Sequence, residues 1–353
     1  MAEPKRLQPG EARSAGAIPQ RRVPQAWPAH RRFRILSLDG GGVRGVFPAT
    51  ILAELERRYT NGRSVGEFFD LIAGTSTGGI LSLGLGAGLS GRELQDLYVE
   101  RGDEVFPPPP SGFRGRLRAV WRNSLHYLHY RYDRVALETL LRERLGAGTL
   151  LGSSKVRLIV PAFDGRHSEV FVFKTPHHPD YKTDRHVPMV TIGLATAAAP
   201  TFFRPLERGG YLLVDGGVWA NNPVMLAVIE ALTCFTVESN QIDVLTIGGG
   251  DDPYIISSRQ IRLGGLFFWK DAIFAAMRLQ SLAATNQARL LLGPPNVMRL
   301  DPPINEKRIE LDDWRRAVEG LVPAAVKSVA AKGDMIAEQF LVTPAQPYTP
   351  CPE

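Results

Sequence analysis

The sequence has 353 residues, 44% of them hydrophobic, which is enough to bury the core of one large domain or two. Of its net charge of +6, +5 lies in residues 1–32, so the rest of the chain is nearly neutral and does not resemble a nucleic-acid binder. The two cysteines, Cys234 and Cys351, lie too far apart for a metal or redox motif and form no disulfide framework.

Residues 1–32 are rich in proline and arginine and show no hydrophobic periodicity, which predicts a disordered basic tail. The tail is either a solvated extension or an electrostatic contact for anionic lipid. It contains no apolar segment of the kind found in signal peptides. Residues 71–91 carry no charge, but their glycine, serine and threonine content argues against a membrane span.

A first strand is predicted over residues 33–38, followed by a glycine-rich turn and a helix. Gly40, Gly42 and Gly45 match the G-x-G-x-x-G pattern of dinucleotide-binding turns, although the acidic residue expected about twenty positions later is not distinct. The same loop could instead direct backbone N–H groups, and the charge of Arg44, at an oxyanion. The residues alone leave both interpretations open.

A second strand, turn and helix surround Gly74-Thr75-Ser76-Thr77-Gly78. This order is typical of a nucleophile elbow, in which a serine on a tight turn projects its hydroxyl from the backbone. Gly74 and Gly78 would let the strand and the helix approach closely. The pattern therefore predicts Ser76 as a nucleophile.

Residues 105–132 contain five arginines, several aromatic residues and no acidic residue. This composition fits a solvated loop, a membrane-facing insertion or a site for an anionic ligand whose bases stack on aromatic rings. The residues proposed for ligand or membrane contact are Arg114, Arg116, Arg118, Trp121 and Arg122.

The rest of the chain alternates between predicted strands and helices. Strands are expected at residues 156–160, 169–173, 211–214 and 242–247, and helices at 133–145, 191–199, 223–234, 265–292 and from 312 onward. Such alternation predicts an α/β fold with a largely parallel central sheet covered by helices on both faces.

A serine nucleophile needs a partner that accepts its proton. The histidines of the chain end at His186 and lie in loop-like contexts without a supporting motif. Asp215 ends a predicted strand, is followed by two glycines and the sequence Asn221-Asn222-Pro223, and would lie at the edge of the sheet where strand ends converge. It is either a dyad partner of Ser76 or an ordinary turn aspartate.

Taken in order, three stretches resemble the bacterial patatin-like phospholipases. Residues 39–45 resemble that family's oxyanion loop, formed here by Gly40, Gly41, Gly42, Arg44 and Gly45, residues 74–78 its nucleophile elbow, and Asp215-Gly216-Gly217 its aspartate motif. The resemblance implies a three-layer α/β/α fold, one catalytic domain over residues 33–345 and a C-terminal tail at 346–353. It also implies a Ser76–Asp215 dyad that releases fatty acids from membrane phospholipids without a metal, a cofactor or a catalytic histidine.

A narrower resemblance, to effectors that cyclic dinucleotides activate in antiphage signalling, implies two partners: a phospholipid membrane and a cyclic dinucleotide. It implies no nucleic acid polymer, allows a homo-oligomer, and places the protein in the cytoplasm, acting at the inner membrane surface. Two alternatives remain. One is a dinucleotide-binding oxidoreductase that uses Gly40, Gly42 and Gly45. The other is a non-catalytic lipid or nucleotide sensor that binds through residues 113–132.

Overall fold

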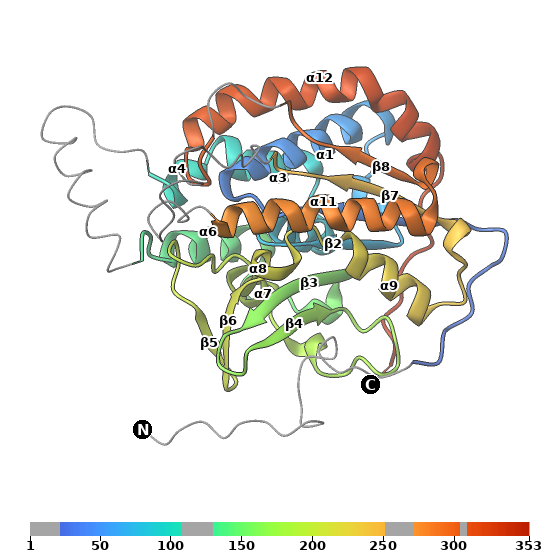
Figure 1. The fold of residues 1–353 in the computed structure, drawn as a ribbon, viewed down its shortest axis with the longest axis horizontal. Coiled ribbons are helices and arrows are strands. Elements are labelled where there is room, and N and C mark those ends of the chain that lie inside the picture. Colours follow the sequence, from blue (N-terminus) through green and yellow to red (C-terminus); the bar gives the residue numbers. More distant parts are fainter. Residues whose placement is uncertain (1–21, 108–129, 251–271, 304–308, 353) are drawn as a thin grey trace, which may run out of the picture.

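The computed structural model describes residues 22–107, 130–250, 272–303 and 309–352 (Figure 1). Within these residues the strands are β1 (Phe33–Leu38), β2 (Leu71–Gly74), β3 (Arg157–Asp164), β4 (Glu169–Lys174), β5 (Leu206–Arg208), β6 (Tyr211–Asp215), β7 (Ile242–Ile247) and β8 (Val297–Leu300). The α-helices are α1 (Val46–Tyr59), α2 (Thr77–Ala87), α3 (Gly91–Val99), α4 (Gly102–Val105), α6 (Val135–Leu145), α7 (Met189–Thr196), α8 (Gly217–Ala220), α9 (Val224–Cys234), α11 (Ala272–Leu292) and α12 (Trp314–Phe340). Short 3₁₀ turns lie at Gly42–Gly45, Val65–Phe68, Leu151–Ser153, Asp184–His186, Ser239–Gln241 and Pro294–Asn296.

The strands form one eight-stranded sheet in the order β5-β6-β3-β2-β1-β7-β8, with β4 also paired to β3. Within the run β3-β2-β1-β7-β8, each strand is parallel to the next. The pairs β3–β4, β3–β6 and β5–β6 are antiparallel. The sheet is thus largely parallel, as predicted, with an antiparallel edge.

Helices cover both faces of the sheet (Figure 1). Successive strand residues point to opposite faces, so Leu36 and Ile72 join the core beneath α1, α2, α3, α6, α7 and α12, whereas Ile35 and Leu71 join the core beneath α9 and α11. The predicted three-layer α/β/α architecture is therefore confirmed.

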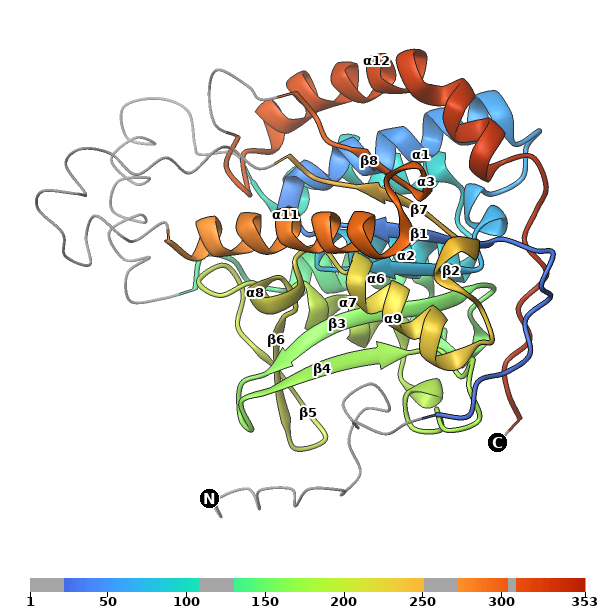
Figure 2. The same cartoon turned by 45° about the vertical axis from the view of Figure 1, so that its right-hand side comes forward.

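Residues 22–32, assigned by composition to the disordered tail, pack onto the sheet instead. The N–H of Gln25 donates to Cys234 O over 2.8 Å, Trp27 is buried against Phe33, and Arg31 pairs with Asp70 over 2.6 Å. Figure 2 shows this segment running beside the C-terminal residues 341–352. The earlier part of the predicted tail, residues 1–21, lies outside the described residues.

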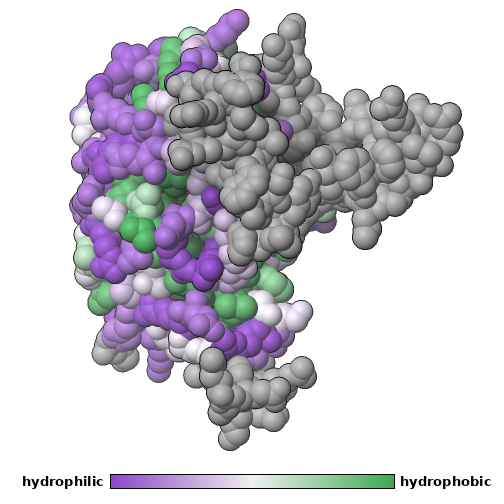
Figure 3. Space-filling model, turned by 90° about the vertical axis from the view of Figure 1, so that its left-hand side faces the viewer, coloured by the Kyte–Doolittle hydropathy of each residue, from purple (hydrophilic) through white to green (hydrophobic). Residues whose placement is uncertain are grey.

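The parallel strands point toward the left of Figure 1, and Figure 3 views that end of the molecule, where hydrophobic and hydrophilic side chains of described residues are intermixed. Loops at the carboxyl ends of parallel strands converge there, which is where α/β sheets commonly place a site. Among the helices in the described part of the chain, none is both long and apolar enough to cross a bilayer.

Candidate active site

Ser76 occupies a strained turn between β2 and α2. Its backbone has φ 54° and ψ −119°, a conformation that residues other than glycine rarely adopt. Its N–H donates to Thr196 Oγ1 over 3.0 Å, and that hydroxyl donates to Pro161 O over 2.7 Å, so α7 and β3 both hold the turn. Because Ser76 is the N-cap of α2, the N–H groups of the first helical turn lie beside it and favour negative charge there.

The glycines on either side of Ser76 are required by close packing. A Cβ on Gly78 would lie 2.2 Å from Leu38 O, and a Cβ on Gly74 would lie 2.1 Å from Gly78 O. Any larger residue would push α2 away from β1 and β2. The position of Ser76 over the end of the sheet therefore depends on glycine at both sites.

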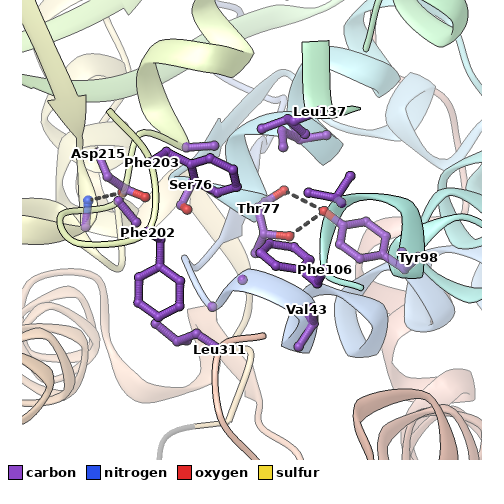
Figure 4. A pocket seen from close by; sticks show the side chains of 18 of the residues that line it. Val43, Ser76, Thr77, Tyr98, Phe106, Leu137, Phe202, Phe203, Asp215 and Leu311 are labelled. Carbon is purple, nitrogen blue, oxygen red and sulfur yellow. Dashed lines mark hydrogen bonds between the residues drawn. The ribbon is translucent and has the colours of Figure 1, made fainter. Parts of the chain in front are cut away.

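Asp215 lies at the end of β6 and close to Ser76 (Figure 4). Its side chain is buried, its N–H donates to Ala198 O over 3.0 Å, and its Oδ1 accepts the N–H of Gly217 over 2.7 Å. Burial raises the pKa of Asp215 from 3.8 to about 6, while hydrogen bonds with the Ser76 side chain and the Gly217 N–H act in the opposite direction. Such a carboxylate is ionised at neutral pH and more basic than an exposed aspartate.

The glycine-rich loop after β1 borders the same cavity as Ser76. Gly42 has φ +57°, and a Cβ there would lie 2.3 Å from Leu311 O. The next residue, Val43, donates its N–H to that same oxygen over 2.9 Å. In the described part of the chain no group accepts the N–H of Gly41 or Gly42, so these two donors remain free to bind an anion.

Asp39, at the start of the loop, is buried and pairs with Arg299 of β8. Arg299 Nη1 lies 2.9 Å from Asp39 Oδ1, and Nη2 lies 2.7 Å from Oδ2. Although burial lowers the pKa of Arg299, the carboxylates of Asp39 and Asp301 raise it, so the guanidinium stays charged. No spacing along the chain links these residues, because 260 positions separate them.

The side chain of Arg44 is bound to backbone carbonyls. Nε donates to Gly41 O over 3.3 Å, and Nη1 donates to Gly250 O. Arg44 therefore ties the loop after β1 to the loop after β7. The neighbouring Gly45 packs against α2, since a Cβ there would lie 2.0 Å from Thr77 Oγ1.

Ser76 and Asp215 open onto a largely apolar cavity of about 270 Å³. Its walls include Ile80, Leu97, Phe106, Leu137, Leu140 and Phe203 (Figure 4). Tyr98, also in the wall, is hydrogen-bonded to Thr77 Oγ1, and burial raises its pKa to about 12, so it stays neutral. A cavity with mainly apolar walls suits a hydrocarbon chain.

Several residues that shape the site were not identified from the sequence. Thr196 fixes the backbone of Ser76, Leu311 fixes the glycine loop, and Asn221 lines the cavity. Leu311 belongs to no motif, and Asn221 was noted only as part of the sequence that follows Asp215. Their importance follows from contacts between distant segments, which spacing along the chain cannot reveal.

Among the described residues, one buried group of side chains has ligand atoms close enough to hold a metal: His177, Glu230 and Cys234. The Glu230 carboxylate, however, already accepts hydrogen bonds from Lys174 Nζ, Tyr181 Oη and His177 Nε2, the last over 2.9 Å. Burial raises the pKa of Glu230, but its bond to His177 and the charge of Lys174 lower it well below its usual range. Without a cation the network is already paired and charge-balanced, so it is explained as a structural element.

The proposed contact residues Arg114, Arg116, Arg118, Trp121 and Arg122 lie outside the described residues. The end of that arginine-rich stretch is described. The N–H of Arg131 donates to Thr201 O over 3.0 Å, and the N–H of Tyr132 donates to Phe202 O over 2.9 Å. The stretch is therefore joined to the loop that carries Phe202 and Phe203, two residues of the cavity wall.

Comparison with known proteins gives a consistent result. A family model described as patatin-like phospholipase matches residues 36–228. A cGAMP-activated phospholipase of Pseudomonas aeruginosa (strain BWHPSA011 / Pa011) is 39% identical over 221 residues, covering 61% of this chain and 62% of its own. Proteins of the same name are 34% identical over 258 residues in Vibrio cholerae (67% and 70% of the two chains) and 29% identical over 351 residues in Escherichia coli (90% and 95%).

Proposed function

Because the chain belongs to the patatin-like phospholipase family, we propose that it hydrolyses acyl esters of membrane phospholipids with Ser76 as nucleophile and Asp215 as general base. The observation that carries the proposal is the buried Asp215 carboxylate beside the strained Ser76 turn, at an apolar cavity. The oxidoreductase alternative explains the glycines but assigns no role to either residue.

In the first step, the acyl chain enters the apolar cavity and its ester carbonyl lies against Ser76. Asp215 accepts the hydroxyl proton as Ser76 Oγ attacks the carbonyl carbon. The free N–H groups of Gly41 and Gly42, with the first turn of α2, stabilise the negative charge on the carbonyl oxygen. The C–O bond to the lipid alcohol then breaks, and Asp215 returns the proton to that alcohol.

In the second step, water replaces the lipid alcohol. Asp215 accepts a proton from the water, whose oxygen attacks the acyl carbon of the Ser76 ester. The same N–H groups stabilise the second oxyanion. Fatty acid is released and Ser76 regains its proton.

The test is fatty-acid release from phospholipid vesicles by the wild-type protein, Ser76→Ala and Asp215→Asn. Ser153→Ala, which alters an exposed serine in the 3₁₀ turn before β3, is the matched control. Wild type and Ser153→Ala are expected to release fatty acid, and the two dyad variants to lose at least about a thousandfold in rate. Full activity in either dyad variant would refute the proposed mechanism.

We further propose that a cyclic dinucleotide activates the enzyme, in line with the names of its relatives. A surface groove lined by Tyr130, Arg134 and Arg204 has suitable chemistry. Among the described residues, neither arginine forms an ion pair with a carboxylate, and the guanidinium of Arg204 lies 6.0 Å from the centre of the exposed Tyr130 ring. Arginines bind phosphodiesters, and an exposed ring can stack on a purine.

The groove is connected to the cavity wall. Arg134 Nη2 donates to Arg204 O over 3.3 Å and to Pro205 O over 2.9 Å, in the same loop as Phe202 and Phe203. A phosphate that binds Arg134 competes with those carbonyls and would shift the loop that borders the cavity. Ligand binding in the groove could therefore change access to Ser76.

Arg134→Gln and Arg204→Gln are expected to raise the cGAMP concentration for half-maximal vesicle hydrolysis at least tenfold. Arg92→Gln, on the exposed face of α3, serves as the matched control and should leave it unchanged. Unchanged cGAMP dependence in both groove variants would refute this location. A parallel titration with anionic vesicles in place of cGAMP distinguishes a nucleotide site from a lipid headgroup site.

A further inference from the structure

Asn221 places a buried amide oxygen without a partner at the active-site cavity. The residue is 1% exposed and lines the cavity together with Ser76 and Asp215. Its Oδ1 has no hydrogen-bond partner in the described part of the chain. Buried acceptors of this kind are rare and unfavourable, so one at a reaction centre calls for an explanation. The two-step mechanism above does not use it.

The orientation of the amide is set by its surroundings. Nδ2 donates to Ser281 Oγ over 3.1 Å, which leaves Oδ1 as the unpaired end. The backbone carbonyl of Asn221 accepts the N–H of Gly40 over 2.9 Å, and the adjacent Ala220 O accepts Thr75 Oγ1 over 2.6 Å. The glycine loop and the serine elbow thus both bind the backbone of residues 220 and 221 and fix the position of the Asn221 side chain.

Asn221 Oδ1 lies close to both members of the dyad. A Cβ on Gly217 would lie 3.1 Å from Asp215 Oδ1 and 3.2 Å from Asn221 Oδ1. A Cβ on Gly40 would lie 2.5 Å from Asn221 Oδ1 and 3.3 Å from Ser76 Cβ. Adding the two distances in each case places Asn221 Oδ1 at most about 6.3 Å from Asp215 Oδ1 and at most about 5.8 Å from Ser76 Cβ. The two oxygens therefore flank a space that a side chain at position 217 would narrow.

We propose that Asn221 Oδ1 positions the hydrolytic water of the second step, which makes this inference dependent on the proposed function. A water molecule donates two hydrogen bonds of about 2.8 Å at a roughly tetrahedral angle, so it bridges acceptors about 4.5 Å apart, a separation that lies within the upper limit set by these contacts. Asp215 accepts the proton that is transferred, and Asn221 accepts the other hydrogen bond and fixes the direction of the attacking lone pair.

The covalent changes of this step balance without another reactant. The water oxygen bonds to the acyl carbon as its proton passes to Asp215. The tetrahedral intermediate then collapses: the bond from the acyl carbon to Ser76 Oγ breaks, and Asp215 returns the proton to Oγ. Asn221 exchanges no proton. It is a positioning residue, and its loss should slow deacylation more than acylation.

The adjacent Asn222 provides a matched control because its side chain is fully engaged. Its Oδ1 accepts the N–H of Val224 over 3.0 Å and the hydroxyl of Ser37 over 3.2 Å, and its Nδ2 donates to Thr285 Oγ1 over 3.0 Å. These bonds stabilise the first turn of α9 and connect it to β1 and α11. Asn222→Ala should therefore lower thermal stability without changing the balance between the two steps.

The test uses the full chain with cGAMP and a p-nitrophenyl acyl ester. Asn221→Ala is expected to keep the rapid burst of p-nitrophenol while steady-state turnover falls about 10- to 100-fold. Mass spectrometry should then detect accumulated acyl-Ser76, and added hydroxylamine, which needs no activation by a base, should restore turnover. Asn222→Ala should show the wild-type ratio of burst rate to turnover.

A burst rate that falls by the same factor as turnover, or no change in either, would overturn the assignment. Asn221→Asp provides a second test in case the alanine variant misfolds, because aspartate keeps an oxygen acceptor at position 221. This retained acceptor should recover deacylation, which a purely structural role of Asn221 would not require, and the added negative charge near Asp215 should displace the pH profile to higher pH. If the wild-type protein never forms acyl-Ser76, the proposed function fails as well. If it does, only the role of Asn221 is in question.

Discussion

Replacing Asp215 with asparagine is expected to abolish hydrolysis and, at the same time, to stabilise the folded protein. Burial raises the pKa of this carboxyl from 3.8 to about 6, so the folded state binds the proton more tightly than the unfolded state does. The free energy of unfolding therefore decreases as pH rises from 3.8 through 6. At pH 7.5 the ionised group costs about 3 kcal/mol, from a shift of about 2.2 units at 1.36 kcal/mol each.

An asparagine fits the same contacts without the charge. Its carbonyl oxygen can accept the N–H of Gly217 and its amide can donate to Ser76 Oγ. The free energy of unfolding of Asp215→Asn is thus expected to exceed that of the wild-type protein by up to about 3 kcal/mol at pH 7.5 and by about half of that at pH 5. For a chain of 353 residues, with an unfolding entropy of about 2.1 cal/mol/K per residue, 3 kcal/mol corresponds to a rise in Tm of about 4 °C.

Calorimetric unfolding of the wild-type protein, Asp215→Asn and Ser76→Ala at pH 7.5 and pH 5 measures this effect. Ser76→Ala serves as the inactive control that keeps the buried charge. Asp215→Asn should be more stable than both others at pH 7.5, and its advantage should shrink at pH 5. If Asp215→Asn is less stable than the wild-type protein at pH 7.5, or if its gain in stability does not depend on pH, the argument that Asp215 is a buried, destabilising base is refuted.

Three further outcomes are expected. The value of kcat/KM for ester hydrolysis should rise with an apparent pKa near 6 and level off above about pH 7, because Asp215 must be ionised; a flat profile between pH 5 and 8 would contradict this. Arg299→Leu leaves the buried carboxylate of Asp39 unpaired and should lower the free energy of unfolding in urea by about 3–5 kcal/mol, whereas a loss below about 1 kcal/mol would contradict the role of this pair. Leu140→Trp fills part of the apolar cavity and should reduce kcat/KM at least tenfold more for long-chain than for short-chain esters; equal losses would mean that the chain binds elsewhere.

Local pattern was enough to predict the strands that organise the molecule. The predicted first strand coincides with β1 (Phe33–Leu38), and the strand predicted over residues 242–247 coincides with β7. Both are short, mainly apolar runs that lead into glycine-rich turns, which makes their carboxyl ends distinct. The order of strands and helices then limits the topology to a largely parallel sheet covered on both faces, since parallel strands need crossover helices.

Composition was a poor guide to residues 22–32. The segment is polar and rich in arginine and proline, as disordered tails are, yet Trp27 fits between Phe33 and Phe235, and Arg32 pairs with Asp243 over 2.5 Å. These partners lie up to about 210 positions away in the sequence. A few such contacts order a chain whose local pattern contains no periodicity, so only the folded structure identifies them.

The same reasoning explains why three motifs do not by themselves make a site. The matched family region ends at residue 228, but groups beyond it hold the glycine loop: Arg299 pairs with Asp39, and Leu311 O accepts the N–H of Val43. Ser281, also beyond that region, orients the Asn221 amide. A chain ending at residue 250 would keep every motif, yet it would lack Arg299, the partner of Asp39, and the Leu311 carbonyl that binds the glycine loop. The proposed catalytic residues lie between positions 39 and 217, whereas contacts that hold them in place also come from α11, β8 and the segment before α12.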